Sequence, residues 1–148
     1  MTREVRQAIR ICPDHVRQAV ADLCAGDELR LEELRFRTGR KIQARTNSRA
    51  YDLPIPVTQG LLNELTERAT RQSAYAMQDM LRRGFVTLAG GHRLGICGTA
   101  VLREGEIQTI RSISSLNLRI ARELRGVGES CAAYLWTHPA STLLFGAP

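Results

Sequence analysis

The chain has 148 residues, of which 43% are hydrophobic, so it is long enough to bury the core of one domain. It carries 21 basic residues against 15 acidic ones, a formal net charge of +6. Every basic residue except Lys41 is an arginine, and the arginines are scattered among the acidic residues rather than gathered in one run. This pattern favours a solvated surface over a nucleic-acid-binding face.

Cysteine and histidine spacing gives no metal-binding motif. The cysteines form no C-x-x-C pair, and the three histidines are equally dispersed. The amino terminus MTREVRQAIRI lacks an apolar signal core, and no segment approaches the length of a membrane-spanning helix. We therefore expect a cytoplasmic protein with reduced thiols and no bound metal.

The first predicted element is a short, peripheral helix that starts near Pro13, contains VRQAVADL and ends before Gly26. Residues 34–37 then alternate apolar and arginine side chains, and Gly39-Arg40 turns the chain into a second strand over residues 42–45. These two strands predict a ribbon in which the arginines of the first strand, Arg35 and Arg37, share one face.

The stretch from Asn47 to Pro56 is predicted to be a loop or an extended connection rather than an element, because it contains two prolines. Thr58 and Ser73 are the predicted N-caps of two helices that follow. Each helix carries an apolar stripe typical of a core-facing surface, formed by Leu61, Leu62, Leu65 and Ala69 in the first and by Ala74, Met77 and Leu81 in the second.

A β-hairpin with a charged tip is predicted next. Residues 85–88 and 93–96 read as strands, and Gly90-Gly91 supplies the positive φ that a tight turn needs. His92 has no Ser, Cys or carboxylate spaced as a catalytic partner, so we interpret it as a turn residue. Gly95 and Gly98 weaken a strand unless something packs against the backbone there, which we expect.

Three further strands complete an antiparallel meander. Residues 99–102 and 107–111 flank a Glu104-Gly105 turn, and residues 116–120 alternate apolar and polar side chains as a half-buried strand does. A helix pair followed by a meander belongs to the α+β class.

The segments GGHRLGICG and SSLNLRIARE, with LEELRFRTGRKI and SAYAMQDMLRRGFVTLA before them, resemble the stage III sporulation protein AA family of endospore-forming bacteria, which is related to type II and type IV secretion ATPases. The resemblance covers most of the chain. It implies that residues 1–138 are the N-terminal α+β domain of a secretion-type ATPase, with the helix pair packed on the antiparallel meander.

The same resemblance implies that residues 139–148 are the first strand and the start of a P-loop ATPase domain. STLLFGAP contains only the beginning of the G-x-x-x-x-G-K-[ST] loop, namely Gly146, Ala147 and Pro148. The full-length protein would therefore bind ATP and Mg²⁺ and hydrolyse ATP. This chain alone lacks the loop lysine and the Walker B acid, so we expect it to need no cofactor and to be inactive.

Related secretion ATPases are hexamers in which N-terminal-domain arginines reach nucleotide phosphates, and a guanidinium suits that role because its planar fork fits phosphate oxygens. Arg93, Arg111 and Arg119 are the candidates here, since they flank turns or strand ends within the block of strongest resemblance. The alternative is that they are surface arginines or pair with nearby acids: Glu104, Glu106 and Glu123.

The resemblance finally implies a subunit that energises a sporulation-specific secretion channel, peripheral at the cytoplasmic face of a membrane in the mother cell, with channel membrane proteins as partners. Two alternatives stay open. One is a single-stranded nucleic-acid-binding module, which an aromatic content of 5% disfavours because base stacking needs several aromatic side chains on one face. The other is a purely structural assembly domain.

Overall fold

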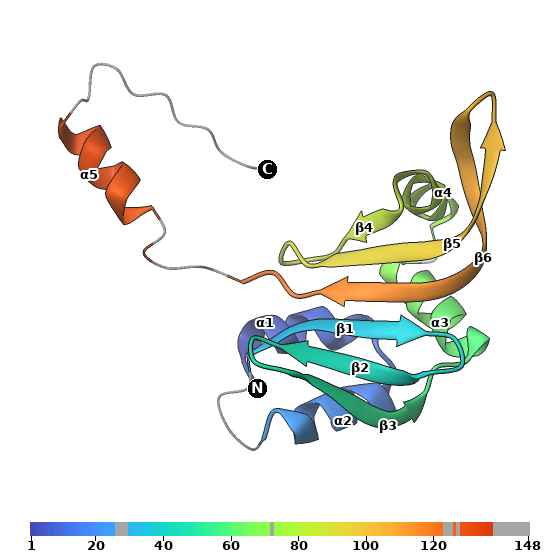
Figure 1. Ribbon diagram of the computed structural model, residues 1–148, viewed down its shortest axis with the longest axis horizontal. Helices are drawn as coiled ribbons and strands as arrows, with labels where there is room; N and C mark the ends of the chain where they lie inside the picture. The colour runs from blue at the N-terminus through green and yellow to red at the C-terminus, as the bar shows by residue number, and fades with distance from the viewer. Residues whose placement is uncertain (26–29, 72, 123–125, 127, 138–148) are drawn as a thin grey trace.

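The computed structural model describes residues 1–25, 30–71, 73–122, 126 and 128–137. Its helical elements, shown in Figure 1, are α1 (Arg3–Ala8), η1 (Ile9–Ile11), α2 (Asp14–Leu23), α3 (Gln59–Ala69), α4 (Ala74–Arg83) and α5 (Glu129–Thr137). Its strands are β1 (Leu31–Arg37), β2 (Lys41–Thr46), β3 (Ala50–Pro56), β4 (Phe85–Thr87), β5 (Arg93–Arg103) and β6 (Glu106–Arg119).

All the strands join one six-stranded antiparallel sheet in the order β3-β2-β1-β6-β5-β4. One apolar or aromatic side chain from each strand lies in a single cross-strand row: Tyr51, Ala44, Leu34, Leu118, Leu94 and Val86. The predicted α+β class and the predicted meander, β4-β5-β6, are confirmed. The predicted ribbon, β1 and β2, belongs to the same sheet because β1 pairs with β6.

The two central helices begin where the sequence predicts. The Thr58 hydroxyl accepts the N–H of Leu61 at 3.2 Å, and the Ser73 hydroxyl accepts the N–H of Ala76 at 3.3 Å. Each bond satisfies a backbone donor that the first helical turn leaves free. α3 then packs against β6, and α4 against β4 and β6, so the helix pair covers the apolar face of the meander.

The first predicted helix, α2, is not peripheral. It begins after Pro13, as predicted, but Val16 and Val20 are completely buried in the main core. The helix covers part of the sheet through β3. α1 precedes it and was not predicted, because its six residues give too short an apolar pattern to recognise. Gly26 lies outside the described residues.

Residues 50–56 form a strand, β3, so the prediction of a loop or connection over residues 47–56 was wrong. Among the strands that the structure describes, β3 is at the edge of the sheet and pairs with β2 alone. Pro54 and Pro56 are both exposed there, and an edge strand tolerates proline because half of its N–H groups face away from the sheet. Tight pairing with β2 outweighed the local signal of the prolines.

β5 and β6 are longer than predicted, and each runs continuously where the sequence suggested two shorter strands. Residues 99–111 project beyond the other strands as a two-stranded arm, which rises clear of the sheet in Figure 1. The arm begins at a register shift beside Gly98, opposite Ser112, whose φ is +45°. Close packing at Gly98 confirms the expectation that something contacts this backbone.

Candidate functional site: an arginine depression on the open sheet face

The sheet face opposite the apolar core carries charged side chains in register. Arg45 on β2, Glu33 on β1, Arg119 on β6 and Arg93 on β5 are consecutive cross-strand partners, and all but Glu33 are exposed. Arg119 and Arg93 are therefore like charges on directly paired residues, which destabilises a sheet unless something offsets the repulsion. Glu33, on the other side of Arg119, and the Phe85 ring beside Arg93 are the groups here that can offset it.

A depression of about 790 Å³ lies over part of this face. Its ionisable lining consists of five arginines and two glutamates: Arg30, Arg35, Arg45, Arg119, Arg122, Glu32 and Glu33. Asn47 and Asn117 add amide groups, and Ala121 forms part of the wall. The lining comes from β1, β2 and β6 and from the residues directly beyond their ends, which the pairing of β1 with both neighbours brings together.

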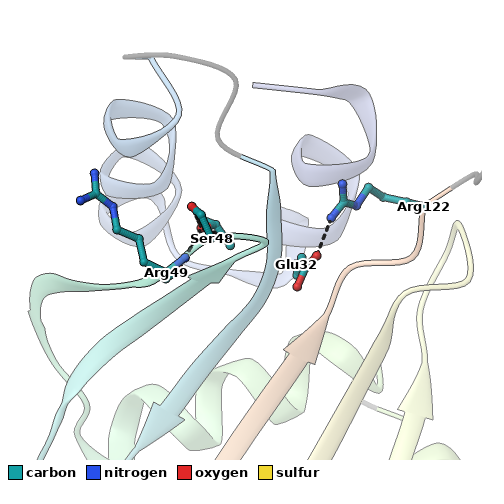
Figure 2. A network of polar contacts seen from close by, with 5 residues as sticks. Glu32, Ser48, Arg49 and Arg122 are labelled. Carbon is teal, nitrogen blue, oxygen red and sulfur yellow. Dashed lines mark hydrogen bonds and ion pairs between the residues drawn. The ribbon is translucent and has the colours of Figure 1, made fainter.

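Both carboxylates are already bonded to an arginine. Glu33 accepts the Nε–H of Arg35 at 2.7 Å, and Glu32 accepts a bond from Arg122 at 3.1 Å (Figure 2). Successive side chains of a strand normally point to opposite faces. A register shift in β1 between Leu31 and Glu33 allows the side chains of both glutamates to line the same depression. Burial raises the pKa of Glu33, but the bond from Arg35 and other neighbours lower it on balance.

Three arginines of the depression, Arg30, Arg45 and Arg119, form no ion pair with any carboxylate among the described residues. They are exposed, so their guanidinium groups remain available to an anion from outside. Guanidinium forks bind the oxygens of phosphate or carboxylate in a bidentate manner. The depression therefore has the chemistry of an anion site.

The predicted arginines separate into two groups. Arg119 lines the depression, and Arg93 is its direct cross-strand partner, with its guanidinium carbon 3.4 Å from the centre of the Phe85 ring. Arg111 lies elsewhere, opposite Thr99 at the base of the arm. The predicted phosphate-loop residues, Gly146, Ala147 and Pro148, lie outside the described residues.

Sequence reasoning missed Arg30, Arg45 and Arg122 as members of this site. Buried and more exposed side chains alternate along β2, and Arg45 is at an exposed position. This alternation could have placed Arg45 on the same face of the ribbon as Arg35 and Arg37. Arg30 and Arg122 join the depression only through the pairing of β1 with β6, which leaves no local pattern in the sequence.

His92 also differs from its prediction as a residue of a charged hairpin tip. It directly follows the turn at Gly90 and Gly91, but its side chain is buried, and its Nδ1 accepts the N–H of Ala121 at 3.0 Å. Gly90 of the turn lies against Gln7 of α1, an element the sequence did not reveal, and His92 is buried although Gly90 and Gly91 themselves are exposed.

Within the described part of the chain, no cluster of three or more His, Cys, Asp or Glu side chains is placed to hold a metal ion. In the same residues, every helix is too short or too polar to cross a bilayer.

Comparison with known proteins places these observations in a family. A family model described as "Sporulation stage III, protein AA" matches residues 2–148. Stage III sporulation protein AA of Bacillus subtilis (strain 168) is 28% identical over 145 residues, which cover 97% of this chain and 47% of that protein. The chain thus spans about half the length of the curated relative it matches.

Among solved structures, the VirB11 ATPase from the Brucella suis type IV secretion system, in complex with sulphate, is 17% identical with a TM-score of 0.44. The match covers 98% of this chain and 40% of that one.

Proposed function

This chain belongs to the sporulation stage III, protein AA, family, and on that premise we propose that it is the N-terminal, non-catalytic part of an ATPase that energises a sporulation-specific secretion channel. Residues 1–138 are the N-terminal domain and residues 139–148 begin the P-loop domain, with Gly146, Ala147 and Pro148 at the start of its phosphate loop. ATP and Mg²⁺ bind in the remainder of the protein. The complete ATPase is a hexamer at the cytoplasmic face of a membrane in the mother cell, docked on channel proteins.

The observation that carries this proposal is the arginine depression. Five guanidinium groups surround two carboxylates that are already bonded, so the site has spare positive charge for an anionic group. In the proposed hexamer, the phosphates of ATP held by a P-loop domain lie over this face. Arg119, with Arg45 and Arg30 beside it, then stabilises the charge that develops during phosphoryl transfer.

Arg93 supports the same role from the neighbouring strand. Its position over the Phe85 ring fixes the guanidinium by a cation–π contact, and its repulsion with Arg119 is relieved when an anion binds over the open face of the two strands. Because the bound anion removes the repulsion between Arg93 and Arg119, it binds more tightly than it would to two arginines that are far apart. Arg111 is too far along β6 to share this anion, so it serves as the matched control.

The test uses the full-length protein with Arg119→Ala, Arg45→Ala, Arg93→Ala and, as control, Arg111→Ala. We expect the turnover of ATP to fall by roughly tenfold or more in Arg119→Ala and Arg45→Ala, with ATP binding and sedimentation retained, because the lost charge acts on the transition state. Arg111→Ala keeps wild-type turnover. Wild-type turnover in all of the depression variants would refute the proposal.

The rival nucleic-acid function is checked with the same variants. A labelled single-stranded oligonucleotide should show no salt-dependent binding to the wild-type chain, since Phe85 is the one aromatic residue that the described strand rows place on the open face, and Arg93 covers its ring. Binding at low salt that is lost in Arg119→Ala and Arg45→Ala would favour the nucleic-acid module instead.

A further inference from the structure

The residues directly after β6 are held by a backbone bond from the N–H of Ile120 to the carbonyl of Glu32 and, one residue further on, by a buried histidine. The side chain of His92 is 1% exposed, and its Nδ1 accepts the backbone N–H of Ala121 at 3.0 Å. Ala121 lies two residues beyond Arg119 and directly before Arg122, and all three residues line the arginine depression. The hydrogen bond therefore fixes the backbone directly before Arg122, while Arg119 is held in the sheet between Glu33 and Arg93.

This bond requires one protonation state of the imidazole ring. Nδ1 accepts a hydrogen bond, so the ring is neutral and its proton is on Nε2. Nε2 is buried and has no hydrogen-bond partner within the described residues. A buried ring that satisfies only one of its two nitrogens is poorly arranged for stability alone, and the bond it does make is the one to Ala121.

The turn before His92 packs closely against α1 and the residues after β6. A Cβ atom at Gly90 would lie 2.7 Å from the Gln7 side-chain oxygen, and one at Gly91 would lie 3.8 Å from the Cβ of Ala121. Both glycines have positive φ, +84° and +76°, which lets the turn fit between α1 and the end of β6. α1, the β4–β5 turn and the end of β6 therefore meet at His92.

We propose that His92 is a positioning residue for the arginine depression, whose neutral ring holds Ala121 and whose protonation releases the end of β6. Protonated, Nδ1 carries a hydrogen that faces the N–H of Ala121, so an acceptor is replaced by a second donor and the bond is lost. Arg119 stays in the sheet, but the backbone of Ala121 and Arg122 is no longer fixed relative to it, and anion binding weakens. This inference rests on the proposed function of the depression as an anion site.

Burial, rather than the surrounding charges, favours the neutral form of His92 near neutral pH. Burial lowers the pKa of His92 below its ordinary value of 6.5, and Glu4 on α1 opposes this shift. Of the flanking arginines, Arg93 lies over the Phe85 ring and Arg122 is bonded to Glu32. β4 and the turn, residues 85–91, carry no charged side chain. Because the pKa of His92 is lowered, release takes place at a pH below the ordinary histidine value of 6.5.

The test compares wild type with His92→Asn, whose side-chain oxygen accepts a hydrogen bond near the position of Nδ1 but does not titrate. His15→Asn on the exposed side of α2 is the matched control. Two quantities are measured at pH 8 and pH 5.5: the hydrogen-exchange protection factor of the Ala121 amide, and the Kd for inorganic triphosphate. Triphosphate itself titrates between these pH values, so the Kd of wild type is divided by the Kd of His92→Asn at each pH, which removes that effect.

In wild type and His15→Asn we expect protection of the Ala121 amide to fall between pH 8 and pH 5.5 in proportion to the protonated fraction of His92 that the ring shifts report at pH 5.5. His92→Asn should show no such fall and should bind triphosphate more tightly than wild type at pH 5.5 alone. In wild type, the Ala121 amide shift and the His92 ring shifts should titrate with one midpoint, a measurement that needs no variant.

An Ala121 amide whose protection and chemical shift do not follow the His92 titration would overturn the inference, as would a His92→Asn variant with the wild-type pH profile. Absence of triphosphate binding in every variant at pH 8 would contradict the proposed function of the depression. The amide measurements still decide the role of His92 in that case, so the two failures are distinct.

Discussion

Replacement of Gly98 by alanine tests the close packing at the base of the β5–β6 arm. A Cβ atom there would lie 2.6 Å from Cγ2 of Ile110, 2.7 Å from the carbonyl oxygen of Arg111 and 2.9 Å from that of Ser112. Two of these three atoms are backbone, so β6 itself must shift. Overpacking of this kind costs about 1–3 kcal/mol, and we expect a loss of about 2 kcal/mol in the free energy of unfolding.

Gly95→Ala, on the same strand, is the matched control. The nearest atom to its added Cβ is the Asn117 carbonyl oxygen at 3.8 Å, an ordinary contact. The substitution reduces the conformational freedom of the unfolded chain, so it should be neutral or stabilise the protein by roughly 0.4–1 kcal/mol. The difference between the two variants therefore comes from packing and not from the loss of a glycine as such.

Urea denaturation followed by circular dichroism measures both variants. With m-values of about 1–3 kcal/mol/M, the expected loss moves the midpoint of Gly98→Ala down by roughly 1 M, with m unchanged, while the midpoint of Gly95→Ala stays or rises. Equal midpoints for the two variants would refute the packing argument, and so would a Gly98→Ala protein as stable as wild type.

Three further predictions concern helix caps, a thiol and pH. Thr58→Ala and Ser73→Ala should each lower the free energy of unfolding by about 1 kcal/mol in urea titrations, unlike an exposed mid-helix substitution such as Gln78→Ala. Burial raises the pKa of Cys12 to about 12, so peptide mapping after iodoacetamide at pH 8 should find exposed Cys97 modified and Cys12 not. Because the pKa of Glu33 is lowered, its ionised carboxylate contributes to the free energy of unfolding above pH 4.5, and this contribution is lost as the pH falls further. Glu33→Gln should therefore reduce the acid destabilisation seen in urea titrations from pH 6 to pH 3.

The parts of the fold that the sequence predicts are strands with a clear apolar–polar alternation and helices with a recognisable N-cap residue. Leu116 and Leu118 alternate with polar neighbours on β6, and burial follows that alternation in the structure. Thr58 and Ser73 start α3 and α4 because a side-chain oxygen at that position satisfies a local backbone donor. These signals arise within a few residues, so they need no knowledge of the tertiary structure.

The candidate site could not be predicted in the same way, because its parts come from strands that are distant in the sequence. Arg119 was singled out, but its partners Arg30 and Arg45 join it only because β1 pairs with both β2 and β6. The burial of His92 likewise depends on α1, more than 80 residues earlier in the chain. Long-range pairing of this kind is set by the whole packed core rather than by any local motif.

The two edges of the sheet limit how copies of this protein can associate. On one side, β3 carries Pro54 and Pro56, neither of which can donate a hydrogen bond to an added strand. On the other side, β4 is only three residues long and offers a short template. Growth of the sheet from one molecule into the next is therefore disfavoured at both ends. Copies of this chain that associate are therefore expected to do so through side-chain contacts on faces and helices, which can separate and rejoin without breaking a shared backbone ladder.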